Sequence, residues 1–213
     1  MTTVTAPVVA WRGDPAGDRP LVVLLHGRGS DETDIINLAD HLPKGLTYAA
    51  VRAPIAEGGG YAWFANRGIG RPIAESLAET MSGFRTWLDD VTPAGRPVVL
   101  VGFSGGAAFA GGLALNDPDR YAGAAILSGT LPFDAGVPTT PGRLAGLPVF
   151  VAHADDDHVI PSELLMRTWS YLHAGAGSTL TSVRDPGGHG ISYAVLRELQ
   201  TWLRDVTAID EAA

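Results

Sequence analysis

Ser104 is the residue of this chain that is best placed to do chemistry. It occupies the centre of Gly102-Phe103-Ser104-Gly105-Gly106, which follows the β-branched run 98–101 and precedes the small-residue segment 107–113. A G-x-S-x-G turn between a strand and a helix strains the serine backbone and exposes the hydroxyl at the helix N-terminus. Such a hydroxyl attacks an acyl carbon when a base and an acid support it.

His189 is the predicted general base. In chains with an elbow of this type the acid follows the serine and the histidine follows the acid. Of the six histidines, only His158, His173 and His189 come after the acidic cluster begins. His158 directly adjoins the acids and His173 falls within a helix expected over 161–173, whereas His189 lies between glycines before the last helix. A neutral imidazole there can take the serine proton and return it to the leaving group.

The acid comes from three adjacent aspartates, of which Asp157 is the predicted partner of the base. Asp157 is followed by Val159-Ile160-Pro161, which anchors the turn and starts the next helix. Asp155 and Asp156 are expected to hydrogen-bond the backbone of the turn, as aspartates often do. Asp185 is an alternative acid, although it is close to the base in sequence.

Acyl transfer also needs N–H donors where the oxyanion forms. Gly105 follows the nucleophile and supplies one backbone N–H, and the Arg28 N–H in His26-Gly27-Arg28-Gly29 is the predicted second donor. This glycine-rich loop lacks the Lys-Ser/Thr ending of a phosphate-binding loop. Glu32 stands where a dinucleotide fingerprint needs its third glycine. His26 itself is expected to be structural.

The four polar groups are predicted to follow strands, and the carboxyl ends of parallel strands meet at one edge of a sheet. The apolar runs that indicate strands are Leu21–Leu25, Thr47–Val51, Val98–Val101, Ala124–Leu127, Val149–Ala152 and Leu180–Val183, with Val8–Trp11 as an antiparallel edge strand. The clearest helix has its apolar stripe at Ile73, Leu77, Met81, Phe84 and Leu88, and others are expected near Asp31, Ser104, Pro161 and Ile191. Strands alternating with helices predict one α/β domain over 1–213, with a mostly parallel sheet, helices on both faces and flexible ends at 1–6 and 206–213.

The composition narrows the class of partner. The 213 residues carry a formal net charge of −8 and no dense basic run, which argues against nucleic acid or an anionic membrane as the main partner. The apolar strings are only strand-length and the start of the chain lacks a secretory pattern. We expect a cytoplasmic protein that acts on a small molecule, with a homodimer left open. Cysteine is absent, which removes disulfides and thiolate chemistry.

These residues together resemble the phospholipase/carboxylesterase family of α/β-hydrolases, which includes small bacterial carboxylesterases and acyl-protein thioesterases. The motifs that carry the resemblance are Leu24-Leu25-His26-Gly27-Arg28-Gly29, Arg52-Ala53-Pro54 with Trp63-Phe64, Gly102–Gly106, His153-Ala154 through Asp157 to Val159-Ile160-Pro161, and Gly188-His189. The resemblance runs from about Leu21 to the final helix and implies a single-domain α/β-hydrolase fold. It places the family's acid at Asp157.

The chain departs from the family pattern in three places. Gly105 stands where the family usually has Gln, so a side chain that lines the site is gone while the backbone N–H remains. Ala154 replaces the usual Gly of the acid loop. Residues 56–72 lack close resemblance to the thioesterase members, which leaves the acyl substrate open.

The leading hypothesis is a cofactor-free serine hydrolase that cleaves carboxylic esters, with thioesters and lysophospholipids as further substrates. Ser104 attacks, His189 moves the proton, Asp157 orients His189, and the N–H groups of Arg28 and Gly105 hold the oxyanion. Lactonase, amidase, peptidase and acyltransferase activities remain open within this chemistry.

Substrate contacts are expected from residues near the strand ends. Trp63, Phe64 and Leu131 are candidate apolar walls for the acyl group, with a plain core role as the alternative for each. The Gly- and Pro-rich segments Ala56–Pro72 and Gly129–Pro148 are long enough to act as lids or binding loops, with plain mobile surface as the alternative for each.

Two other functions are compatible with parts of the sequence. His153, Asp155, Asp157 and His158 loosely echo the ligand cluster of a metal-dependent hydrolase, although no second cluster is present in the sequence. The fold could also serve as a non-catalytic binding module, against which the intact Ser, Asp and His set argues.

Overall fold

A seven-stranded sheet forms the centre of the protein, in the order β1-β3-β2-β6-β7-β8-β9. The computed structural model describes residues 6–209. Six strands are parallel, and β1 pairs antiparallel with β3 at one edge. The strands are β1 Val9–Arg12, β2 Leu21–Leu25, β3 Thr47–Val51, β6 Val98–Phe103, β7 Gly123–Leu127, β8 Pro148–Ala154 and β9 Thr179–Asp185. The sheet predicted from the sequence, including its antiparallel edge strand, is confirmed.

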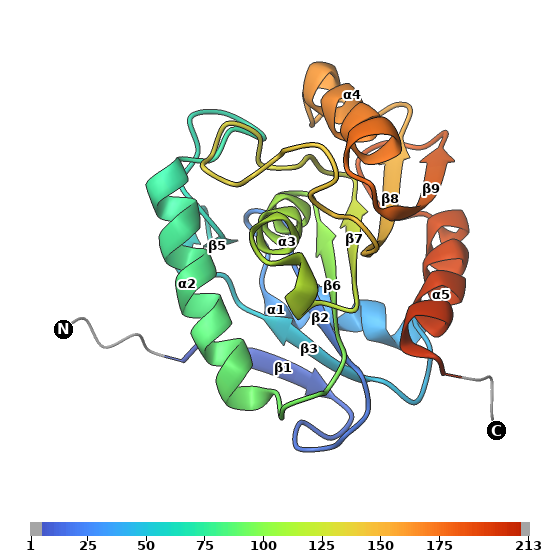
Figure 1. Ribbon diagram of the computed structural model, residues 1–213. Helices are drawn as coiled ribbons and strands as arrows, with labels where there is room; N and C mark the ends of the chain where they lie inside the picture. Colours follow the sequence, from blue (N-terminus) through green and yellow to red (C-terminus); the bar gives the residue numbers. More distant parts are fainter. Residues whose placement is uncertain (1–5, 210–213) are drawn as a thin grey trace.

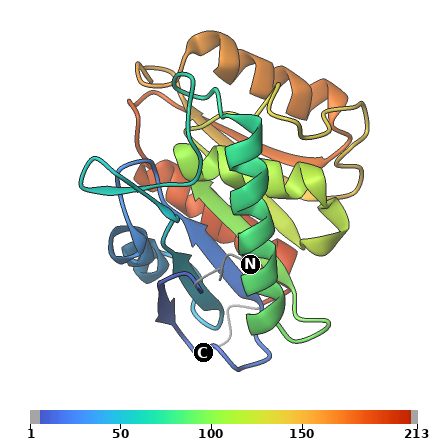
Figure 2. The ribbon, with the colours of Figure 1, turned by 90° about the vertical axis from the view of Figure 1, so that its left-hand side faces the viewer.

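Helices cover both faces of this sheet (Figures 1 and 2). α2 and α3 lie against one face, and α1 and α5 lie against the other. The helices are α1 Glu32–Ile35, α2 Ala74–Val91, α3 Gly105–Asn116, α4 Ser162–Ser170 and α5 Tyr193–Thr207, with short turns at Ile36–His41, Pro118–Arg120 and Tyr171–Gly175. Because β2, β3 and β7 are buried at every residue, their sequences are apolar throughout instead of alternating.

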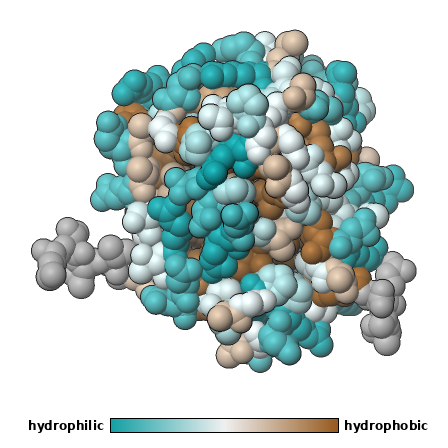
Figure 3. All heavy atoms as spheres, in the orientation of Figure 1, coloured by the Kyte–Doolittle hydropathy of each residue, from teal (hydrophilic) through white to brown (hydrophobic). Residues whose placement is uncertain are grey.

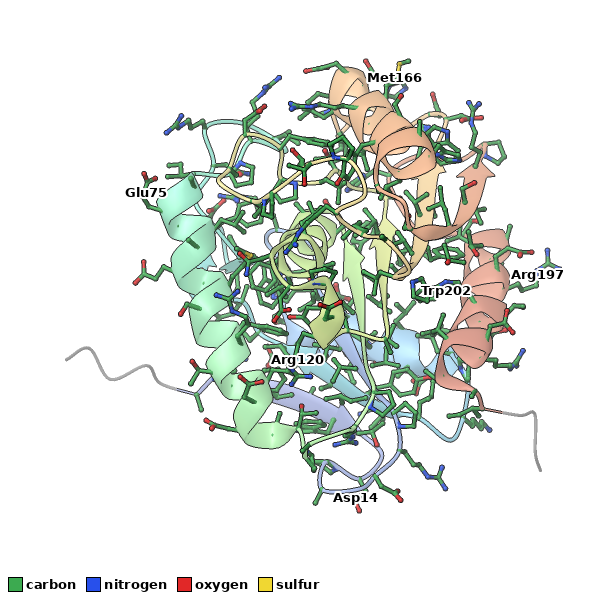
Figure 4. All side chains as sticks on the ribbon, in the orientation of Figure 1. Asp14, Glu75, Arg120, Met166, Arg197 and Trp202 are labelled. Atoms are coloured by element: carbon green, nitrogen blue, oxygen red, sulfur yellow. The ribbon has the colours of Figure 1, made fainter. Side chains whose placement is uncertain are left out.

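The two faces bury separate apolar layers. On one face Trp63 stacks on Phe109 of α3, with 4.4 Å between ring centroids. On the other, Trp202 of α5 packs against Phe150 of β8 at 5.8 Å. Trp202 points toward the sheet while Arg197 on the same helix points away from it (Figure 4). α3 is buried along nearly all of its length, which explains why its sequence is apolar on every side.

Several expectations differ in detail from the structure. The segment 56–72 is only partly a loop, because β4 (Ile55–Glu57) and β5 (Gly60–Ala62) pair as a hairpin within it. The helix after Asp31 is one short turn, which Asp31 caps by accepting from the N–H groups of Thr33 and Asp34. The predicted flexible ends lie mostly outside the described residues, but α5 continues to Thr207, which is buried.

The surface is mixed in character. On the face in Figure 3, hydrophobic residues show as separate brown areas between hydrophilic ones. Among the helices of residues 6–209, none has both the length and the apolar character needed to cross a membrane.

Candidate active site

Ser104 lies at the sharp turn between β6 and α3. Its backbone has φ 54° and ψ −114°, a strained combination for a residue with a side chain. The glycines beside it are required by close packing. A Cβ on Gly102 would lie 2.1 Å from the carbonyl oxygen of Gly106, and one on Gly106 would lie 2.0 Å from that of Leu25. The turn therefore presses against β2 at a distance that only glycine permits.

The structure brings the three predicted catalytic side chains into one hydrogen-bonded chain. The Ser104 hydroxyl donates to Nε2 of His189 at 2.9 Å, and Nδ1–H of His189 donates to Oδ2 of Asp157 at 2.8 Å. This arrangement selects the imidazole tautomer whose free Nε2 can accept the serine proton. The Asp157 side chain is fully buried, whereas that of His189 is 18% exposed.

Asp157 is held as a carboxylate by several donors. Its Oδ1 accepts from the backbone N–H groups of Val159 at 2.9 Å and Ile160 at 3.0 Å. Burial alone would raise the pKa of Asp157, but the hydrogen bonds from His189, Ile160 and Val159 outweigh it and hold the pKa below the ordinary 3.8. Val159 and Ile160, which follow Asp157 closely in sequence, thus stabilise the negative charge that lies beside His189.

Ser128 and Asp185 anchor the loop that carries His189. The sequence did not indicate this role for Ser128, and it suggested Asp185 as an alternative acid. The hydroxyl of Ser128, directly after β7, donates to the carbonyl of Gly190 at 2.8 Å. Asp185, the alternative acid, instead accepts from the Gly187 N–H at 2.7 Å and from the Ser192 hydroxyl. Asp185 therefore shapes the turn before the base and does not contact it. A serine immediately after a buried strand was the available signal for Ser128.

The two predicted oxyanion donors face one another across the elbow. A Cβ on Gly105 would lie 3.3 Å from the backbone nitrogen of Arg28, so the two backbone N–H groups are close. Within residues 6–209, neither N–H donates a hydrogen bond. Two unused donors beside a nucleophile are what a developing oxyanion requires.

His26 fixes the strand end from which the Arg28 loop starts. Its Nδ1–H donates to the Gly27 carbonyl at 2.7 Å, and its Nε2 accepts from the Ala53 N–H at 3.0 Å. The indole N–H of Trp63 donates to the His26 carbonyl at 2.9 Å. Burial lowers the pKa of His26, which favours the neutral ring that this pair of bonds needs. Its position agrees with the structural role expected from the sequence.

The β4–β5 hairpin clamps the same loop from outside. The Gly29 N–H donates to the Tyr61 carbonyl at 2.9 Å, and the Tyr61 N–H donates to the Ser30 carbonyl at 3.0 Å. The Arg28 guanidinium donates twice to Glu57, at 2.5 Å each. It also donates once to the backbone carbonyl of Phe64, at 3.0 Å. These bonds restrain both the backbone and the side chain of Arg28, the predicted second donor.

A cavity of about 280 Å³ opens beside these groups. Its lining residues are Arg28, Trp63, Phe64, Asn66, Ile69, Gly70, Ser104, Gly105, Ala108, Thr130, Val159, Ile160 and His189. Trp63 and Phe64, the candidate acyl walls, border the cavity, and both also belong to the core. Leu131 does not line it: this side chain is buried in the core against Gly111 of α3. The prediction for Leu131 is therefore wrong by one residue, because the neighbouring Thr130 lines the cavity instead.

The residues of the alternative metal cluster do not converge. His153 is 3.9 Å from Asp155, and Asp155 is engaged by Arg184 at 2.6 Å. His158 is 86% exposed, and both oxygens of Asp157 are already hydrogen-bonded. Over the whole described part of the chain, no group of three or more His, Asp or Glu side chains is arranged to hold a metal ion.

The parallel sheet with the serine elbow at the end of β6 defines an α/β-hydrolase fold. The chain belongs to the phospholipase/carboxylesterase family, whose sequence model matches residues 6–207. The resemblance stated from the motifs is thereby confirmed.

Individual relatives agree with this family. The chain is 25% identical over 190 residues to the putative hydrolase MhqD of Bacillus subtilis, covering 87% of this chain and 92% of that protein. It is 28% identical over 142 residues to the carboxylesterase SOBER1 of Arabidopsis thaliana, covering 64% and 62%. The crystal structure of a carboxylesterase from Mesorhizobium loti superposes with a TM-score of 0.81 at 23% identity, covering 95% of this chain and 96% of that one. A Bacillus cereus carboxylesterase gives 0.81 at 22% identity, covering 94% of each chain.

Proposed function

We propose that the protein hydrolyses carboxylic esters through an acyl-enzyme on Ser104. The observation that carries the proposal is the chain of hydrogen bonds from Ser104 through His189 to Asp157, with distances of 2.9 and 2.8 Å. A nucleophile, a base and an orienting carboxylate at hydrogen-bond distance are the geometric requirement for acyl transfer. The family membership supports the same class of reaction.

In the acylation step, Ser104 Oγ bonds to the ester carbonyl carbon as its proton passes to Nε2 of His189. The carbonyl oxygen becomes negative and is held by the N–H groups of Arg28 and Gly105. The tetrahedral intermediate then collapses, the bond to the leaving alcohol breaks, and His189 protonates that oxygen. Water deprotonated by His189 attacks the acyl-enzyme in the reverse sequence and releases the acid. Asp157 stabilises the imidazolium in both halves.

As the partner we propose a small-molecule ester that fits the 280 Å³ cavity. The steps above draw only on side chains and backbone of the chain itself, so they require no cofactor. Thioesters and lysophospholipids undergo the same acyl transfer, and we retain them as substrates to be compared with simple esters.

The test is turnover of p-nitrophenyl esters from acetate to octanoate, beside an acyl thioester and a lysophospholipid, by wild type and Ser104→Ala. We expect kcat to fall about 10³-fold or more in the variant, and a fluorophosphonate to label only wild type. Ser178→Ala is the matched control, since it removes a buried hydroxyl that has no hydrogen-bond partner and no contact with the cavity. Turnover that persists in Ser104→Ala would overturn the mechanism, and a folded wild type that neither turns over nor labels would favour a binding module.

A further inference from the structure

Phe103 is the last residue of β6 and directly precedes Ser104. Its ring contacts the imidazole of His189, with 5.1 Å between the ring centroids and 42° between the ring planes. Phe103 is half-buried and does not line the catalytic cavity. The catalytic steps described above give this ring no task, although it contacts the group that moves the proton in each of them.

The same ring packs against the loop that leads to Arg28. A Cβ on Gly27 would lie 3.2 Å from Cδ1 and 3.5 Å from Cε1 of Phe103, so the glycine leaves the room that the ring occupies. The backbone of Phe103 is fixed as well, because it pairs with Leu127 of β7 in the sheet. The ring is therefore held from the strand and from the loop while it contacts His189.

The two hydrogen bonds of His189 leave one motion of its ring weakly restrained. Ser104 bonds to one imidazole nitrogen and Asp157 to the other. The lone pair and the N–H of an imidazole lie in the ring plane, so these bonds resist poorly a rocking of the ring about the line that joins its nitrogens. A second ring in contact at 42° blocks that rocking on one side.

The contact also matters for charge, because His189 becomes positive during the reaction. The π electrons of an aromatic ring attract a cation that lies within about 6 Å of the ring centroid, and Phe103 is within that range. Since the side chain of His189 is mostly buried, water screens this attraction only in part. The imidazolium forms as the oxygen attacks, so its stabilisation favours the transition state over the bound substrate.

We propose that Phe103 is a positioning residue for the reaction. Its ring holds the His189 imidazole toward Ser104 and stabilises the imidazolium that forms when the serine proton is transferred. The inference rests on the proposed function, because it adds a residue to the mechanism of the same site. Phe103 acts through His189 and does not contact a substrate in the cavity.

The experiment measures kcat and KM for p-nitrophenyl butanoate, the rate of labelling by a fluorophosphonate, and the melting temperature. Phe103→Leu and Phe103→Met remove the ring but keep an apolar side chain, whereas Phe103→Tyr keeps the ring. Phe150→Leu is the matched control. It removes a ring from β8 in the same apolar layer, at a residue that is fully buried and does not line the cavity.

Both kcat and the labelling rate are expected to fall about tenfold in Phe103→Leu and Phe103→Met, with KM within about twofold of wild type. Phe103→Tyr stays within about threefold of wild type for both rates, because the ring remains against His189. Phe150→Leu keeps kcat within about twofold of wild type, although it melts at least as far below wild type as Phe103→Leu does, since the buried position loses more packing.

Unchanged kcat in both Phe103→Leu and Phe103→Met overturns the inference, as does a change in KM alone. A loss of kcat that is as large in Phe103→Tyr or in Phe150→Leu overturns it too, since packing in general would then account for the effect. Wild type separates the two proposals. If it hydrolyses the ester and the Phe103 variants match it, only the role of Phe103 fails; if it neither hydrolyses the ester nor reacts with the fluorophosphonate, the proposed function fails.

Discussion

Neutralising Glu57 tests whether the hairpin positions the oxyanion donor. In Glu57→Gln the side chain keeps one acceptor but replaces the other with an amide NH₂, which cannot accept from the guanidinium of Arg28. The pair of 2.5 Å bonds is then broken, while the backbone bonds between Gly29, Ser30 and Tyr61 remain. The loop is loosened by this change and is not released.

The structure sets the expected size of the effect. The two side chains are 31% and 43% exposed, so solvent screens the ion pair and its loss lowers the free energy of unfolding by only about 0.5–1 kcal/mol. Complete loss of an oxyanion donor lowers kcat by about 10²–10³. Because the Arg28 N–H stays in place and only its restraint weakens, we expect kcat to fall about tenfold, with KM nearly unchanged.

The assay is steady-state hydrolysis of a p-nitrophenyl ester together with thermal melting. Asp89→Asn is the matched control, because it breaks a partly exposed pair with Arg120, and neither residue lines the cavity. Both variants are expected to melt about 1–4 °C below wild type, but only Glu57→Gln loses kcat. If Glu57→Gln retains kcat within about twofold, or raises KM alone, the hairpin does not position the donor.

Three further changes probe the base, its anchor and the cavity. Asp157→Asn is expected to lower kcat by about 10³–10⁴, because His189 is no longer held in the tautomer that can accept the serine proton. The pKa of Asp157 is held below 3.8 in the folded protein, so the carboxylate stabilises the fold fully at neutral pH and less as the pH falls below about 4. Urea unfolding across pH should therefore show that the difference in stability between wild type and Asp157→Asn shrinks below about pH 4. Ser128→Ala removes the bond that anchors the loop after the base and is expected to lower stability by about 1 kcal/mol and kcat several-fold; unchanged kcat and melting would show that the bond is dispensable. Gly105→Gln adds a side chain that starts 3.3 Å from the Arg28 nitrogen and lines the cavity, so the octanoate-to-acetate ratio of kcat/KM should fall about tenfold, and an unchanged ratio would mean that acyl chains avoid this wall.

The fold and the grouping of Ser104, His189 and Asp157 could be predicted from the sequence, because the patterns that indicate them are local. Apolar runs such as Leu21–Leu25 mark strands buried on both faces, and glycines at 102 and 106 mark a turn that packs against its neighbours. Once the sheet is parallel, its geometry brings residues that follow different strands to one edge. Ser104 and His189 lie 85 positions apart, yet the strand ends predict that they meet.

The remaining parts of the site depend on contacts between segments that carry no local signal. Glu57 reads as a charged residue in a Gly-rich stretch, and nothing nearby in sequence indicates that it pairs with Arg28, 29 positions away. Leu131 was misplaced for the related reason that one step along an irregular loop changes which side chain reaches the cavity, and no periodicity fixes that choice.

Two backbone donors at the elbow are left unpaired within residues 6–209: the N–H groups of Arg28 and Gly105. The side chains beside them bond to one another, Ser104 to His189 and His189 to Asp157. The two N–H groups therefore remain for a substrate oxygen to satisfy. An ester carbonyl oxygen satisfies the two donors and becomes a better acceptor as the oxyanion develops, which favours the transition state over the ground state. The two donors should therefore govern how fast an ester reacts more than how tightly it binds.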